Sequence, residues 1–122
     1  MKILVIDDEK EILLLVSKVL ERNDYEVTTA ESILAASKLI HNNTWDLIIS
    51  DVMLPYLGGF ELVEDIKATY STPVILITGM SEDVFKATIN KADKILYKPF
   101  SSDELINAVK QLTAGATTSN SN

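Results

Sequence analysis

Polar residues stand at the ends of four of the five short apolar runs in this 122-residue sequence, and their types suit phosphoryl chemistry. Asp7 and Asp8 follow the first run, Asp51 follows the third, Thr78 the fourth and Lys98 the fifth. If the runs are strands of one parallel sheet, these residues meet at the edge where such sheets bind their ligands.

A divalent cation and a phosphoryl group fit this set of side chains. Mg²⁺ prefers oxygen ligands, keeps several waters, and typically takes one or two carboxylates together with a substrate phosphate. Asp7 and Asp8 suit the metal, directly or through water. Asp51 can be both ligand and nucleophile, because carboxylates form aspartyl phosphates. Lys98 would neutralise charge on the transferring phosphoryl oxygens, and the Thr78 hydroxyl could donate to one of them.

Each of these residues also has an ordinary structural explanation. Asp7 and Asp8 precede a helix and could cap it, Asp51 could be a loop acid, Thr78 part of a turn, and Lys98 a surface lysine. Capping alone does not predict polar groups of these types at four strand ends. Three carboxylates so close would also repel one another unless a cation or Lys98 offsets them.

The elements that would position these residues alternate along the chain. Apolar, β-branched runs read as strands, and the stretches between them have helical periodicity. Strands are expected at 3–6, 26–29, 47–49, 74–77 and 95–97, and helices at about 9–22, 32–41, 60–70, 81–90 and from a capping box to about 112. This order predicts an α/β fold with a doubly wound, five-stranded parallel sheet in the flavodoxin-like order 2-1-3-4-5.

Two of the expected helices carry finer predictions. The first should bury one apolar face, which comprises Ile12, Leu15, Val16, Val19 and Leu20. The last should begin with the capping box Ser101-x-x-Glu104.

Composition narrows the class of protein. A net charge of −7 and a pI of about 4.6 argue against direct nucleic-acid binding. There is no cysteine, which excludes disulfides and thiolate metal sites. The first apolar run is too short for a signal peptide or a membrane span, so a cytoplasmic protein without membrane contact is expected. Residues 1–113 should form one domain, and the small, polar residues 114–122 a disordered tail or the start of a linker.

Four motifs together resemble the receiver domains of response regulators in bacterial two-component signalling, over residues 1–113. They are Ile-Leu-Val-Ile-Asp7-Asp8-Glu9, Asp51-Val-Met-Leu-Pro55-Tyr-Leu-Gly-Gly59-Phe, Ile77-Thr78-Gly79 and Tyr97-Lys98-Pro99-Phe100. The set is specific, because the motif positions occur in the right order at about the right spacing.

The resemblance implies a set of roles in the site. Asp51 would be the phosphoacceptor, Thr78 a hydroxyl switch and Lys98 the phosphoryl-binding lysine. Mg²⁺, or Mn²⁺ in its place, would be held by Asp7, Asp8, Asp51 and the backbone carbonyl of Met53. Pro99 would follow a cis peptide bond.

The resemblance also implies partners and a mode of action. A sensor histidine kinase or a phosphotransfer protein would supply the phosphoryl group, and a downstream protein partner or an output domain would read the conformational change. Such a domain catalyses only its own phosphorylation and dephosphorylation, so we do not expect an enzyme.

Three features depart from the family pattern. Gly58 stands where the family often has Asp. The segment between Thr78 and Lys98 is short by roughly half a helical turn. Ile95 occupies the position of the family's switch aromatic, three residues before the lysine.

Two other functions use similar chemistry. An Mg²⁺-dependent phosphohydrolase with an aspartyl nucleophile would need a carboxylate two residues past Asp51, where Met53 stands. A flavodoxin-like FMN carrier would need a phosphate-binding loop after the first strand, where Asp7-Asp8-Glu9 would repel phosphate without a metal. Turnover of a phosphate ester, or a yellow colour on purification, would favour these alternatives.

Overall fold

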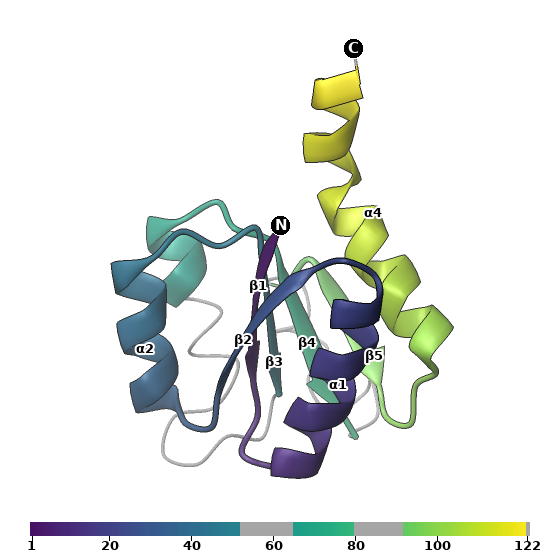
Figure 1. Ribbon diagram of the computed structural model, residues 1–122. Coiled ribbons are helices and arrows are strands. Elements are labelled where there is room, and N and C mark those ends of the chain that lie inside the picture. Colours follow the sequence, from purple (N-terminus) through teal and green to yellow (C-terminus); the bar gives the residue numbers. More distant parts are fainter. Residues whose placement is uncertain (52–64, 80–91, 122) are drawn as a thin grey trace.

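The computed structural model describes residues 1–51, 65–79 and 92–121, with side chains as far as Thr113, and shows the predicted parallel sheet (Figure 1). All strand pairs are parallel and the order is β2-β1-β3-β4-β5, which confirms the prediction. The strands are β1 (Lys2–Ile6), β2 (Glu26–Ala30), β3 (Leu47–Asp51), β4 (Val74–Thr78) and β5 (Lys94–Tyr97).

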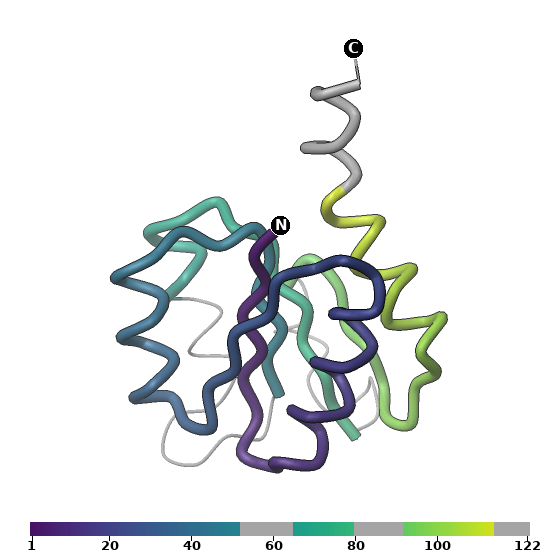
Figure 2. Tube along the Cα trace, viewed as in Figure 1, coloured from purple at the N-terminus to yellow at the C-terminus, as the bar shows by residue number. Residues whose placement is uncertain are grey.

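Helices cover both faces of the sheet. Helices α1 (Lys10–Arg22) and α4 (Ser102–Ser121) lie on one face, and α2 (Ile33–Asn42) lies with the helical residues 65–69 on the other (Figures 1 and 2). The helix expected at 81–90, and residues 60–64 of the one expected at 60–70, fall outside the described residues. No helix in the described part of the chain is both long and apolar enough to cross a membrane.

Alternate residues of each strand contribute to two separate apolar cores. Ile3 and Val5 of β1 belong to the core under α1 and α4, whereas Leu4 and Ile6 belong to the core under α2. All residues of β3 and β4 are buried. Double coverage explains why these strands are apolar over most of their length, without the alternation of a half-exposed sheet.

The buried face of α1 differs from the predicted one at a single position. Leu15 is 53% exposed, whereas Leu13 is buried at 6%. An α-helix turns by about 100° per residue, so Leu15 lies about 100° from the fully buried Val16, and Leu13 only about 60° from it. Leu13 therefore takes the place that we expected for Leu15.

Helix α4 begins with the predicted capping box. Glu104 donates its backbone N–H to Ser101 Oγ at 3.0 Å, and Ser101 donates its own to Glu104 Oε1 at 3.1 Å. The helix continues to Ser121 instead of ending near Leu112. Once a helix is nucleated, each further residue adds a hydrogen bond, so a well-anchored helix can extend into a segment that consists mostly of weak helix formers. The domain boundary at residue 113 stays a prediction.

Two aspartates make the same pair of hydrogen bonds at the amino edge of the sheet, and we call them the Asp clamps. Asp46 donates its N–H to the Lys2 carbonyl at 2.9 Å, and its Oδ2 accepts the Lys2 N–H at 2.7 Å. Asp93 bonds Val74 in the same way, at 2.9 and 2.7 Å. One clamp therefore links β1 to the start of β3, and the other links β4 to the start of β5.

Candidate functional site

The carboxyl edge of the sheet brings together the residues that the sequence singled out. The strand register pairs Ile6 with Ser50, so that Asp7, directly after β1, lies beside Asp51, the last residue of the neighbouring β3. Thr78 is the last residue of β4, and its carbonyl accepts the backbone N–H of Lys98 at 2.7 Å. The order of the strands, and not closeness in sequence, therefore builds the site.

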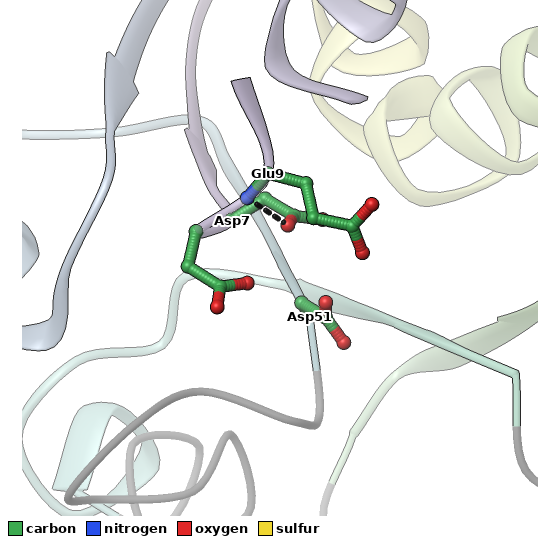
Figure 3. A group of neighbouring side chains, drawn as sticks. Asp7, Glu9 and Asp51 are labelled. Atoms are coloured by element: carbon green, nitrogen blue, oxygen red, sulfur yellow. Dashed lines mark hydrogen bonds between the residues drawn. The ribbon is translucent and has the colours of Figure 1, made fainter. Parts of the chain in front are cut away.

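Four carboxylates form one cluster at this edge. Each of Asp7, Asp8, Glu9 and Asp51 offers an oxygen, and these oxygens all lie within 4.8 Å of one another. Asp7 and Asp51 are buried, and Asp8 and Glu9 are exposed. Figure 3 shows Asp7, Glu9 and Asp51 converging, with a dashed line from the Glu9 backbone nitrogen to the Asp7 carboxylate.

Glu9 is the member of the cluster to which sequence reasoning assigned no role. The acidic run Asp7-Asp8-Glu9 was visible in the sequence. A signal for Glu9 lay in that run, because any residue that directly follows the paired aspartates at a strand end lies near the same edge.

Asp7 is the most perturbed acid of the cluster. Its side chain is 1% exposed. Its Oδ1 accepts the Glu9 N–H at 2.9 Å, and its buried Oδ2 has no hydrogen-bond partner among the described residues. Burial, aided by the nearby charge of Asp51, raises the pKa of Asp7 to about 6, against the lowering effects of the Glu9 hydrogen bond and Lys98. A buried carboxylate oxygen of this kind is a suitable ligand for a cation.

Lys98 supplies the positive charge beside the cluster. Its Nζ lies 3.5 Å from Asp51 Oδ2 and 3.7 Å from Glu9 Oε1. The Lys98–Pro99 peptide bond is cis, as the resemblance implied.

Two predicted roles are less directly visible. Thr78 is fully buried at the end of β4, and its function as a hydroxyl switch stays a prediction. Met53 lies outside the described residues, so its carbonyl as a metal ligand also stays a prediction.

The arrangement is suited to binding a hard cation beside a carboxylate nucleophile. The side-chain atoms of the acidic cluster that could bind a metal are carboxylate oxygens, the ligand type that Mg²⁺ prefers. Asp51 is a member of this cluster, and its buried carboxylate lies beside an ammonium group, 3.5 Å from Lys98 Nζ. A cation held by the cluster and the ammonium group of Lys98 would together offset the negative charge of an anion that approaches Asp51.

A family model described as the response regulator receiver domain matches residues 3–110. Among curated proteins, the chain is 38% identical over 111 residues to the regulatory protein VanRc of Enterococcus gallinarum, covering 89% of this chain and 48% of that protein. It is 34% identical over 106 residues to the transcriptional regulatory protein SpaR of Bacillus subtilis, covering 85% of this chain and 48% of that one. The chain thus spans about half the length of these relatives.

Solved structures are similar over nearly the whole chain. A receiver domain of a Francisella response regulator superposes with a TM-score of 0.87 at 36% identity, covering 94% of this chain and 98% of that one. The response regulator TrrA of Thermotoga maritima, in complex with Mg²⁺ and BeF, gives a TM-score of 0.84 at 35% identity, covering 91% and 97%.

Proposed function

Because the chain belongs to the response regulator receiver domain family, we propose that Asp51 is the residue that accepts the phosphoryl group. One observation carries this assignment. Asp51 is the buried carboxylate that ends β3, belongs to the acidic cluster and lies 3.5 Å from Lys98 Nζ. Membership in this family also favours a receiver over the phosphohydrolase and the FMN carrier.

The transfer itself is a displacement at phosphorus. An Asp51 carboxylate oxygen forms a bond to the phosphorus, while the bond between phosphorus and the donor atom breaks and the donor keeps the electron pair. Lys98 lies where it can contact the transferred oxygens. The Thr78 hydroxyl would donate a hydrogen bond to one of them after the transfer. These groups act by position and charge, since phosphoryl transfer asks for little covalent chemistry from the protein.

Asp7, Asp8 and Asp51 are the side chains that would hold Mg²⁺ or Mn²⁺. Two observations support this proposal: the buried Oδ2 of Asp7 has no hydrogen-bond partner among the described residues, and oxygens of four carboxylates lie within 4.8 Å of one another. The bound cation would neutralise charge on the phosphoryl oxygens. The similar protein TrrA was crystallised in complex with Mg²⁺ and BeF, which supports a site of this type here.

The partners follow from the family. A sensor histidine kinase or a phosphotransfer protein would donate the phosphoryl group, and an output domain or a downstream protein would respond. The chain would act as a switch in the cytoplasm and not as an enzyme with a separate substrate. No direct contact with nucleic acid is proposed for this domain, since its net charge is −7.

Phosphorylation with a small donor tests the assignment of Asp51. Incubation with acetyl phosphate and Mg²⁺ should add one phosphoryl mass to the intact protein, and Asp51→Asn should abolish the addition. Asp103→Asn, which changes an exposed aspartate in the first turn of α4, is the matched control and should be labelled normally. Equal labelling of Asp51→Asn and the unmodified chain would contradict the proposal.

A further inference from the structure

Glu9 stands at the N-cap position of α1 but does not cap the helix. Its side chain makes no capping hydrogen bond. The Glu9 carboxylate instead lies 3.7 Å from Nζ of Lys98, the residue that directly follows β5. Its backbone N–H is used as well, since it donates to Asp7 Oδ1 at 2.9 Å. Glu9 thus connects the start of α1 to the lysine that follows β5.

Lys98 is shared between two carboxylates. Its Nζ lies 3.5 Å from Asp51 Oδ2 and 3.7 Å from Glu9 Oε1. A tight hydrogen bond between an ammonium and a carboxylate measures about 2.7–2.9 Å. Both contacts are longer than this, so the ammonium is close to each oxygen without being tightly bound to either.

We propose that Glu9 is a positioning residue for Lys98: the Glu9 carboxylate competes with that of Asp51 for the Lys98 ammonium group. This inference rests on the proposed function, because it gives Lys98 a phosphoryl group to bind. A phosphoryl group on Asp51 adds negative charge and draws Lys98 towards it. The contact between Glu9 and Lys98 must then weaken, and the link between α1 and the end of β5 weakens with it.

The size of the effect should be modest. The Glu9 side chain is 60% exposed and that of Lys98 is 26% exposed. Solvent screens a pair of this kind, so releasing Lys98 from Glu9 should change the affinity for a phosphoryl mimic by only ~2–5-fold. The direction is the sharper test: removing Glu9 should tighten the binding.

Binding of beryllofluoride at saturating Mg²⁺, measured by calorimetry, tests the inference. Glu9→Gln should bind it ~2–5-fold more tightly than the unmodified chain. Glu9→Asp keeps the charge but shortens the side chain by about 1.5 Å, which takes the carboxylate out of reach of Lys98. It should therefore tighten binding too. Glu11→Gln removes the same charge from the first turn of α1 and should leave the affinity unchanged.

Three results would overturn the inference. Glu9→Asp could bind as the unmodified chain does, in which case only the charge matters. Glu11→Gln could give the same tightening as Glu9→Gln, in which case the effect is not specific to the pair. Unchanged or weaker binding by Glu9→Gln would show that Glu9 does not hold Lys98 back.

A metal-free experiment separates this inference from the proposed function. If the unmodified chain does not bind beryllofluoride, the proposed function fails. A double-mutant cycle of Glu9→Gln and Lys98→Met, measured by urea unfolding without metal, then decides on the pair alone. The two substitutions together should lower the folding equilibrium constant ~2–5-fold less than the product of their separate effects. Strictly multiplicative effects would overturn the inference.

Discussion

Asp7 is ionised at a cost to the stability of the fold. A carboxyl group whose pKa rises on folding, here to about 6, holds its proton more tightly in the folded chain. The contribution of Asp7 to the free energy of unfolding should therefore fall as the pH rises from about 4 to about 6, and the loss should persist above that range. Asp7→Asn removes the cost, so without metal it should raise the free energy of unfolding by about 1–3 kcal/mol at pH 7.

Urea unfolding of the metal-free protein between pH 4 and pH 8 measures this effect. The gain from Asp7→Asn should shrink towards zero as the pH falls to about 4, where the carboxyl is protonated in both states. Asp24→Asn is the control: Asp24 is exposed and has a φ of 68°, a conformation that Asn tolerates. A gain that does not depend on pH would refute the account of Asp7.

Most residues of the site could be predicted because each directly follows or ends a strand. Asp7, Asp51, Thr78 and Lys98 could be placed at one edge once the strand order was known. The contact between Glu9 and Lys98 could not be predicted, because it joins the start of a helix to the end of the fifth strand through side chains. The raised pKa of Asp7 also depends on burial, which the sequence does not give.

Helix α1 shows the limit of periodicity at the scale of one element. Leu13, Leu14 and Leu15 follow one another, and only Leu13 is buried. Val16→Ala removes two methyl groups from a fully buried position and should cost about 2 kcal/mol of unfolding free energy. Leu15→Ala should change it by less than about 0.5 kcal/mol. Thermal or urea unfolding of both variants checks this, and a larger loss for Leu15→Ala would restore the face predicted from the sequence.

The capping box of α4 was recognisable because its two residues are close in sequence. Ser101→Ala removes the hydroxyl that accepts the Glu104 N–H and should lower the free energy of unfolding by about 1 kcal/mol. Ser102→Ala, at the exposed first residue of the helix, serves as the comparison and should have little effect. Equal losses for the two variants would mean that the cap contributes nothing.

A cation in the acidic cluster should stabilise the whole molecule, because only the folded chain brings the ligands together. At 100 times its dissociation constant, Mg²⁺ should add about 2.7 kcal/mol to the free energy of unfolding. The gain should disappear in the double variant Asp7→Asn, Asp51→Asn. NaCl at equal ionic strength is the control for screening. Equal stabilisation of the unmodified chain and the double variant would place the cation elsewhere.

The overall architecture was predictable because five apolar runs alternate with helical stretches, and right-handed crossovers leave few possible strand orders. The length of α4 was not, since residues 114–121 are mostly poor helix formers that follow a well-anchored helix. The two Asp clamps were also missed. Asp46 and Asp93 look like ordinary loop acids until their strand partners are known.

These clamps have a consequence for how many native states the chain can adopt. The inner strands β3 and β4 are buried along their whole length and most of their residues are apolar, so shifting one strand along its neighbour would still place mostly apolar side chains in both cores. Asp46 and Asp93 each favour a single alignment, because the carboxylate and the N–H of one residue must both find the same partner. A chain with both residues changed to Ala should therefore be less stable and should also adopt more than one alignment of its strands. Amide NMR spectra of that double variant should show duplicated signals for β3 and β5, which would be single in the unmodified protein.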